Sequence, residues 1–264
     1  MWLIIKFLFV ITSSVRPLLN AHAHNDYQHT RPLQDALDYG FTSVEADVHL
    51  IDQQLYVYHD FPANPVEDRT LENLYLTPLL ERIQRNNGSV YPGYDDPFLL
   101  MIDIKSESNA TYQKLEELLI KYQNMLTIVK SGVEQVNGPV KVFVSGNRPI
   151  DKVLSSKVIY ASLDGRPADL EHNIPANLMP VVSDNFHNFL SWNGSDEQQI
   201  DPGEMQRLQQ FIKQAHQQGK KVRLWAAPDT PAYWKLALKL DIDLINSDRL
   251  QHLSEFLNNR LRGK

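Results

Sequence analysis

The 264-residue chain contains no cysteine. This excludes a disulfide framework, a thiolate nucleophile and a zinc site built on cysteine. Basic residues are also in the minority, with 26 against 32 acidic residues, and they form no extended run. Because a nucleic-acid surface needs clustered Lys and Arg, we expect no nucleic-acid partner and favour a small-molecule partner.

Linker sequences rich in Gly and Ser or in Pro are absent as well. The chain has 42% apolar and 22% charged residues, which is an ordinary globular composition. A chain of this length buries about three quarters of its unfolded surface, which is enough for one large domain. We therefore predict a single domain over residues 16–264.

The first residues form a separate feature. Met1–Ile11 is nearly all apolar and precedes a short polar stretch. This run is too short to span a membrane and is typical of a secretory signal, so we predict a signal peptide over residues 1–15 with cleavage near Ser14. The protein is then secreted or periplasmic rather than cytoplasmic. Lys6 interrupts the run, and the alternative is a buried first strand of a cytosolic protein.

Beyond this segment, β-like runs alternate with stretches that have apolar residues at helical spacing. The eight β-like runs are Pro17–His24, Thr42–His49, Pro97–Lys105, Val140–Ser145, Val158–Leu163, Met179–Ser183, Val222–Ala226 and Asp243–Asn246. The helical stretches are Leu33–Tyr39, Leu71–Gln84, Tyr112–Lys130, Glu204–Gln218, Thr230–Leu240 and Gln251–Arg260, and Gln54–Asp60 is an extra extended piece. This order and strand count predict an α/β fold, a single (β/α)8 TIM barrel.

Carboxylates occur inside two of these runs. The period of two in a strand places Glu45 and Asp47 on one face, and Asp103 and Lys105 on one face of the next run. A buried carboxylate is costly unless it is paired or binds a metal. Because three oxygen ligands suit Mg²⁺ or Ca²⁺, we predict a metal site at Glu45, Asp47 and Asp103. The alternative is a set of ion pairs with Lys105 or Arg148.

Histidines lie near the same strand ends. His22 and His24 close the first run, and His59 follows the strand that carries Glu45, Asp47 and His49. Two imidazoles can serve as general base and general acid, because their pKa lies near neutral pH. Whether His22 or His24 is the catalytic imidazole stays open at this point, with His24 favoured. We expect Asn25, directly after His24, to contact substrate.

Several motifs in this order resemble one family. They are His-Asn-Asp-Tyr at 24–27, Pro-Leu-x-x-Ala-Leu at 32–37, Glu-x-Asp-Val at 45–48, Tyr-His-Asp at 58–60 and Asp-x-Lys at 103–105. Together with Val222–Ala226 and Asp243–Arg249, they resemble the superfamily of glycerophosphodiester phosphodiesterases, phosphatidylinositol-specific phospholipases C and sphingomyelinase D. The likeness is greatest to the branch named for altered inheritance of mitochondria, and it spans nearly the whole chain.

This resemblance implies a metal-dependent phosphoric diester hydrolase acting on a phospholipid-derived or other small phosphodiester. The implied roles are Mg²⁺ (or Ca²⁺) binding by Glu45, Asp47 and Asp103, proton transfer by His24 and His59, phosphate contact by Lys105 and a pocket wall at Trp225. The chain departs from glycerophosphodiester phosphodiesterases by having His-x-His-Asn instead of His-Arg-Gly, and Asp-x-Lys instead of Glu-x-Lys. These departures are similar to sphingomyelinase D and leave the substrate open.

Two other functions are alternatives. The pair His22-x-His24 also resembles the start of an amidohydrolase metal site, which needs further histidines at later strand ends. The second alternative is a non-catalytic barrel that keeps a remnant of the site. A glycosidase using Glu45 with Asp47 or Asp103 is disfavoured, because alternate residues lie too close for an inverting pair.

Three smaller predictions concern loops. Phe61, Phe186, Phe189 and Trp192 are proposed as an exposed apolar rim for peripheral membrane contact with a lipid substrate. Asp164 is expected to form a turn beside Gly165. Asp248 and Arg249 are expected to pair with each other and close the last turn.

Overall fold

Eight parallel strands form a closed barrel in the computed structural model, which describes residues 15–195 and 197–262. They are β1 (Leu18–Ala23), β2 (Phe41–Ile51), β4 (Phe98–Ile104), β7 (Val140–Gly146), β9 (Ala161–Gly165), β10 (Val181–Asn185), β11 (Lys221–Trp225) and β12 (Leu244–Ser247). Strand β1 pairs with both β2 and β12, which closes the ring. The predicted TIM barrel is confirmed. The predicted signal segment and its cleavage site near Ser14 lie outside the described residues.

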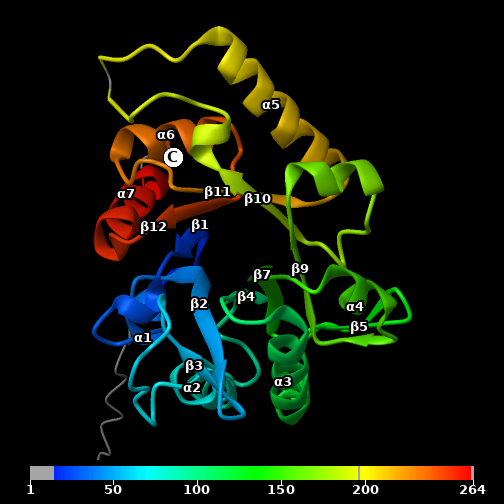
Figure 1. Cartoon of the computed structure of the whole chain (residues 1–264). Helices are drawn as coiled ribbons and strands as arrows, with labels where there is room; N and C mark the ends of the chain where they lie inside the picture. The colour runs from blue at the N-terminus through cyan, green and yellow to red at the C-terminus, as the bar shows by residue number, and fades with distance from the viewer. Residues whose placement is uncertain (1–14, 196, 263–264) are drawn as a thin grey trace, which may run out of the picture.

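Helices cover the outside of the barrel. They are α1 (Gln34–Asp38), α2 (Thr77–Arg85), α3 (Ser108–Lys121), α4 (Ile150–Ser155), α5 (Pro202–Gln217), α6 (Pro231–Lys239) and α7 (Leu250–Arg262). Helices α1 to α4 lie in the lower part of Figure 1, and α5 to α7 lie around the upper part. Helices α5 and α6 each begin with a proline after a capping side chain, Asp201 and Thr230, which accepts a backbone N–H.

Short elements complete the fold. Strand β3 (Gln54–Val57) pairs antiparallel with β2 and forms part of the extra extended piece predicted after that strand. Three further strands, β5 (Ile128–Lys130), β6 (Val133–Val136) and β8 (Val158–Ile159), make a small separate sheet. Short 3₁₀ helices are η1 (Asp26–Gln28), η3 (Gln123–Met125), η4 (Pro167–His172) and η5 (Phe186–Asn188), and η2 (Glu72–Leu76) is a π-helix.

The helix predicted over Tyr112–Lys130 is wrong at both ends. Helix α3 starts earlier, because the Glu107 side chain accepts hydrogen bonds from two backbone N–H groups of the first turn. It ends at Lys121, and the β-branched residues near Ile128 form β5 instead, which pairs with β6 and β8. Branched side chains fit a pleated sheet better than a helix, so sheet pairing prevails here.

Other boundaries also differ from the predictions. The helix predicted over Leu71–Gln84 consists of the π-helix η2 followed by α2, with Pro78 in the first turn of α2. Proline lacks the backbone N–H that an α-helical hydrogen bond needs, and the helix adopts the wider π form just before Pro78. The run Val158–Leu163 divides into β8 and the barrel strand β9. Helix α4 was not predicted.

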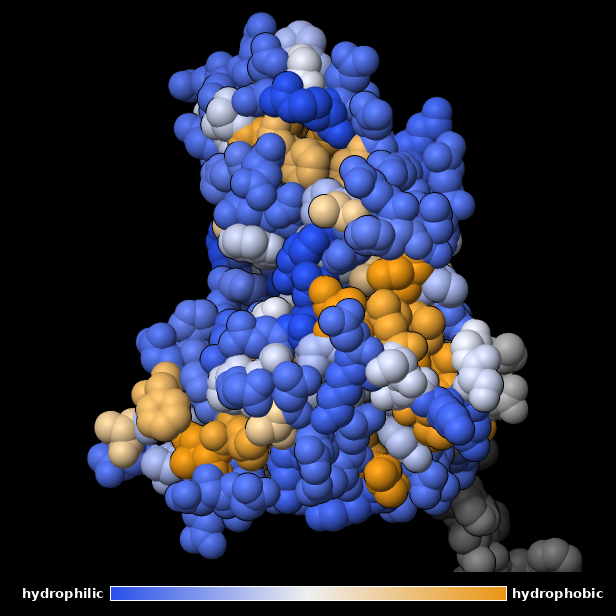
Figure 2. All heavy atoms as spheres, turned by 45° about the vertical axis from the view of Figure 1, so that its right-hand side comes forward, coloured by the Kyte–Doolittle hydropathy of each residue, from blue (hydrophilic) through white to orange (hydrophobic). Residues whose placement is uncertain are grey.

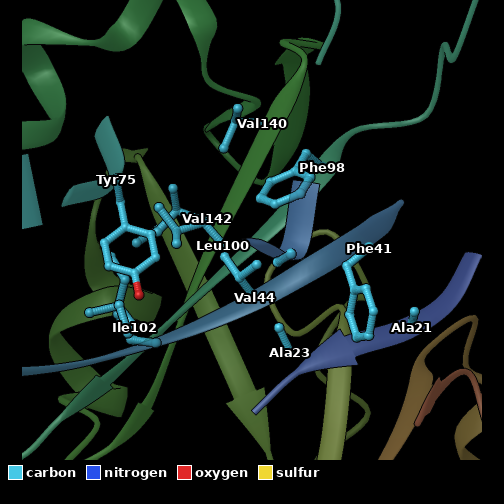
Figure 3. Packing of buried hydrophobic residues seen from close by; sticks show 14 of the residues in the cluster. Ala21, Ala23, Phe41, Val44, Tyr75, Phe98, Leu100, Ile102, Val140 and Val142 are labelled. Carbon is cyan, nitrogen blue, oxygen red and sulfur yellow. The ribbon is translucent and has the colours of Figure 1, made fainter. Parts of the chain in front are cut away.

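The apolar core has two layers. The larger layer lies between strands and helices, and Figure 3 shows side chains of four neighbouring strands beside Tyr75 of η2. The second is a small cluster inside the barrel, formed by Leu99, Met101, Phe143, Val181 and Leu244. Alternation along β2 sends Val44, Ala46 and Val48 to the outer layer, so the polar residues between them face the interior.

The proposed apolar rim is largely wrong. Phe186 and Trp192 are buried, and Phe189 stacks on Phe211, because these rings pack against the barrel and its helices. Phe61 alone of the four is well exposed, at 68%. Hydrophilic residues cover most of the face in Figure 2, where hydrophobic ones gather in separate patches. Within the described ranges, no helix combines the length and apolar character needed to cross a membrane.

Candidate active site

Three carboxylates meet inside the carboxyl end of the barrel. Strands β2 and β4 pair so that Asp47 lies in register with Asp103, and Glu45 lies two residues earlier on the same face of β2. One oxygen atom from each of the three residues lies within 4.8 Å of the other two. Glu45 and Asp47 are buried and Asp103 is partly buried. The predicted convergence of these residues is therefore confirmed.

The two oxygens of Asp47 have different surroundings. Asp47 Oδ2 accepts hydrogen bonds from Tyr27 Oη–H (2.7 Å) and His59 Nδ1–H (3.0 Å), and it lies 3.0 Å from Lys105 Nζ. Asp47 Oδ1 is buried and has no hydrogen-bond partner among the described residues. A buried carboxylate oxygen without a partner is costly, and a cation can satisfy it. This oxygen and the hard ligands around it fit Mg²⁺ or Ca²⁺.

Lys105 supplies positive charge to the same cluster. Its Nζ lies 3.2 Å from Asp103 Oδ1 in addition to its contact with Asp47, so the alternative of ion pairs with Lys105 is also present in the geometry. Arg148 does not take part, because its guanidinium binds Asp169 (3.1 Å). Burial and the charges of Asp47 and Glu45 outweigh Lys105 and raise the pKa of Asp103 to about 6. One lysine therefore does not offset three carboxylates.

His24 borders this cluster from the end of β1. Its Nδ1 lies 2.9 Å from Asp248 Oδ1, and because a carboxylate only accepts, Nδ1 carries the hydrogen. Its Nε2 then lies 3.6 Å from Glu45 Oε2. Burial lowers the pKa of His24, but the hydrogen bond with Asp248 and the charges of Glu45 and Asp248 outweigh burial and raise it. Asp248 therefore sets both the tautomer and the basicity of His24.

His59 has the same arrangement on the other side. Its Nδ1–H donates to Asp47, which leaves Nε2 as the second ring nitrogen, and its side chain is 56% exposed. Tyr27 Oη lies 3.2 Å from the same Nδ1. The buried His49 donates from Nε2 to the backbone carbonyl of His59 (3.1 Å) and so fixes the loop. His49 is a positioning residue, because its ring nitrogen contacts the backbone of His59.

His22 has a different environment from His24. It is fully buried, and its Nδ1 lies 2.7 Å from Ser43 Oγ. Burial, with the nearby charges of Arg223 and His24, holds the pKa of His22 well below its usual range. His22 is therefore a neutral interior residue, and His24 is the histidine of this pair that lies beside Glu45 Oε2.

The other predicted substrate residues lie at the rim. Asn25 has a left-handed backbone (φ 48°), and its backbone N–H donates to Glu45 Oε2 (3.3 Å). Its side-chain N–H donates to Asp248 Oδ1 (3.3 Å), and its Oδ1 lies 2.8 Å from Tyr27 Oη, whose one hydrogen is shared with Asp47, so Asn25 connects three site residues. Trp225 ends β11, is partly buried, and lies in register with Asn185.

A second polar cluster fills the barrel beside the carboxylates. The buried Asp164 accepts from Ser145 Oγ (2.8 Å), Ser183 Oγ (2.6 Å) and Arg166 Nη1 (2.8 Å). Asp164 therefore does not form the predicted turn, because it is the buried acceptor of this network. Its three neighbours lie on β7, on β10 and directly after β9, strands that the barrel brings together.

Arg223 connects the two clusters. Its guanidinium is buried and lies 3.6 Å from Glu45 Oε1 and 3.9 Å from Asp164 Oδ2. Nε–H also donates to Asn246 Oδ1 (3.0 Å). Its positive charge partly offsets the negative charges of Glu45 and Asp164, and its contact with Glu45 helps to fix that carboxylate.

The predicted pair of Asp248 with Arg249 is wrong. Asp248 binds His24, and Arg249 Nη1 instead donates to the carbonyl oxygen of Asp229 (3.3 Å). The ends of β12 and β1 are neighbours in the closed barrel, and this closure brings Asp248 to His24. The sequence reasoning missed this contact because the two residues lie 224 positions apart.

Three further site residues were missed. Tyr27 is the last residue of the His-Asn-Asp-Tyr motif, and its position there could have identified it as a site residue. Arg223 was a charged residue inside an apolar strand, the same signal that identified Asp103. Arg166 follows a strand end without any such pattern, so only the structure reveals it. The later strands β7, β9 and β10 place Ser145, Asp164 and Ser183 at the site and no histidine, which disfavours the amidohydrolase alternative.

Asp26 fixes the loop that carries His24 and Tyr27. Its buried Oδ2 accepts from the Leu33 backbone N–H (2.6 Å) and from Tyr75 Oη–H (2.8 Å). Burial outweighs these hydrogen bonds and raises the pKa of Asp26 to about 7. The folded chain therefore holds this proton at pH values where the unfolded chain has lost it.

We expect Asp26→Asn to remove a pH dependence of stability. Because the pKa of Asp26 is raised on folding, the wild-type free energy of unfolding falls as pH rises from about 4 to about 7, by at most about 4 kcal/mol. Asparagine stays neutral, so the variant is more stable than wild type at pH 8 and close to it at pH 4. Urea unfolding at both pH values checks this, with Asp38→Asn in α1 as an exposed control. Equal pH dependence of Asp26→Asn and wild type would contradict it.

Comparison of the sequence with known proteins identifies the family of this chain. Residues 10–161 match the family described as the AIM6-like phosphodiesterase domain. The altered inheritance of mitochondria protein 6 homolog of Arthroderma benhamiae is 28% identical, over 90% of this chain and 83% of that protein. Altered inheritance of mitochondria protein 6 of Eremothecium gossypii is 29% identical, over 93% of this chain and 71% of that protein.

Solved structures of two glycerophosphodiester phosphodiesterases have the same fold. The protein from Parabacteroides distasonis matches with a TM-score of 0.51 at 14% identity, over 92% of this chain and 98% of that one. The protein from Agrobacterium tumefaciens matches with a TM-score of 0.52 at 14% identity, over 90% of this chain and 99% of that one. The chain therefore belongs to the AIM6-like phosphodiesterase domain family.

Proposed function

We propose that this protein is a metal-dependent phosphodiesterase that hydrolyses a small or phospholipid-derived phosphodiester. One observation carries the proposal. His24 and His59 each give Nδ1–H to a carboxylate, beside a carboxylate cluster in which Asp47 Oδ1 has no hydrogen-bond partner among the described residues. Two oriented imidazoles beside a cation site suit hydrolysis of a diester that needs both proton transfer and charge stabilisation.

Glu45, Asp47 and Asp103 would hold the cation. Five carboxylates lie at the site, these three with Asp164 and Asp248, against the cations Lys105, Arg166 and Arg223, so the carboxylates outnumber the cations by two. A bound divalent cation would offset this excess and stabilise negative charge on the phosphoryl oxygens.

The two histidines would move protons. Each Nε2 is the ring nitrogen that its carboxylate leaves available, because Nδ1–H is committed to Asp248 or Asp47. One imidazole would accept a proton from the attacking hydroxyl or water, and the other would protonate the leaving alcohol. Tyr27 and His49 hold His59, and Asn25 donates to Asp248, the partner of His24, so both rings are oriented before substrate binds.

Lys105 would contact the phosphate. Its side chain is 25% exposed, and its Nζ lies between Asp47 and Asp103 and carries three N–H donors. Burial lowers the pKa of Lys105, but both carboxylates outweigh burial and raise it, so the ammonium stays charged. A fixed positive charge stabilises the additional negative charge that develops on the phosphoryl oxygens during the reaction.

The experiment that tests this function uses wild-type protein after EDTA treatment. We expect no hydrolysis of bis(p-nitrophenyl) phosphate or glycerophosphocholine without metal, and activity after Mg²⁺ or Ca²⁺ is added back. The monoester p-nitrophenyl phosphate is the matched substrate, and it should react more slowly because its dianion brings one more negative charge into a site that already contains five carboxylates. Folded protein that hydrolyses no diester with either metal, or that keeps full activity in EDTA, would refute the proposed function.

A further inference from the structure

Arg166 stands apart from the groups used in the proposed reaction. It follows the end of β9, and its side chain is 29% exposed. Its guanidinium turns back over β7, because Nη2 donates to Ser145 Oγ (3.2 Å). Ser145 is the register partner of Asp103 on the adjacent strand. Arg166 therefore lies on the β7 side of Asp103, whereas Lys105 contacts Asp103 and extends to Asp47 on the β2 side.

The protein holds this guanidinium by one end. Nη1 donates to Asp164 Oδ2 (2.8 Å) and to the Gly165 carbonyl oxygen (2.8 Å), and Nη2 donates to Ser145. These contacts use three of the five N–H donors of an arginine. Nε–H and the second Nη2–H lie together on another edge and have no hydrogen-bond partner among the described residues. Two parallel donors of this kind match the two oxygens of a carboxylate or phosphate.

The support below Arg166 is rigid. Asp164 is fully buried and also accepts from Ser145 and Ser183, while Arg223 lies 3.9 Å from the same carboxylate. The loop after Arg166 is fixed as well, since the Arg166 backbone N–H donates to Asp169 Oδ2 (2.7 Å). The guanidinium is therefore preorganised, and a ligand that binds it loses little side-chain entropy.

We propose that Arg166 binds an acidic group, a carboxylate or a second phosphate, in the alcohol portion of the substrate diester. The inference rests on the proposed function, because the diester itself is assigned to the side of Asp103 where Lys105 lies. A substrate that fills both positions carries one acidic group besides the diester. The site then favours acidic head groups over the corresponding neutral or cationic ones.

Two substrate pairs test this with wild type, Arg166→Gln and Arg166→Lys. Glycerophosphoserine differs from glycerophosphoethanolamine by one carboxylate, and glycerophosphoinositol 4-phosphate differs from glycerophosphoinositol by one phosphate. We expect wild type to prefer the acidic member of at least one pair about tenfold or more in kcat/KM, because the paired hydrogen bonds are charge-assisted. The pair that shows the preference identifies the acidic group.

The variants assign the preference to Arg166. Arg166→Gln should abolish it, because kcat/KM falls much further for the acidic member of the pair than for its partner, and Arg166→Lys should keep part of it. Arg207→Gln, on the exposed part of α5, removes the same charge elsewhere and should keep the whole preference. A wild-type ratio near one in both pairs, or an equal loss on both members in Arg166→Gln, would overturn the inference alone. No hydrolysis of any diester by folded, metal-loaded wild type would overturn the proposed function and this inference with it.

Discussion

Replacing Gly146 by alanine will lower metal affinity and phosphodiesterase activity by on the order of 100-fold. Gly146 ends β7 with a left-handed backbone (φ +65°), and a Cβ at this position would lie 2.1 Å from Asp103 Oδ1 and 2.5 Å from the Ile104 carbonyl oxygen. The carbonyl belongs to the paired strand β4 and cannot move far, so the Asp103 carboxylate must move. A shift of this size removes one of the three oxygen ligands from its position.

Titration calorimetry with Mg²⁺ or Mn²⁺, together with diester hydrolysis, measures both effects. Gly40→Ala is the matched control, because Gly40 also has a positive φ (+84°) and its Cβ would lie 2.3 Å from the Arg16 carbonyl oxygen, outside the site. Both variants should lose stability, and only Gly146→Ala should lose metal affinity. Asp103→Asn sets the scale for the loss of this ligand. Wild-type metal affinity in Gly146→Ala would contradict the prediction.

The sequence predicted the barrel and the convergence of its carboxylates because strand periodicity is local. Glu45 and Asp47 alternate with buried apolar residues, so their shared face could be read from six consecutive positions. The adjacency of β2 and β4 follows from the order of strands in a barrel, and it placed Asp103 beside them. The same local reasoning failed at 126–130, where pairing with distant strands determined the conformation.

The parts that were missed depend on ring closure and on side-chain direction. Asp248 reaches His24 only because β12 pairs with β1, and no pattern around Asp248 indicates which strand end it meets. Nothing in the sequence marked Gly146 as a site residue, because a glycine that follows a predicted strand usually indicates only a turn. Its role depends on the position of Asp103 on the neighbouring strand. Interactions between residues distant in sequence therefore determine the parts of the site that position its ligands.

Asp248→Asn will reduce diester hydrolysis by roughly 10²- to 10⁴-fold, which is the range of a general acid or base that is lost or misoriented. The Asp248 carboxylate accepts Nδ1–H of His24 and so directs Nε2 toward the site. An asparagine can present its N–H₂ group to Nδ1 instead, which favours the other tautomer and leaves Nε2 protonated. The variant removes no ligand of the proposed cation, so its metal affinity should stay close to that of wild type.

A titration separates this positioning role from a loss of structure. Asp248 raises the pKa of His24, so its replacement should lower the pKa of the His24 ring in an NMR titration and move the corresponding limb of the pH–rate profile to lower pH. Asp243→Asn is the matched control, because Asp243 pairs with the exposed His216 (2.9 Å) outside the site and should leave both the limb and the rate unchanged. If Asp248→Asn lowered the rate without moving the His24 pKa, then Asp248 would act on the loop and not on the imidazole.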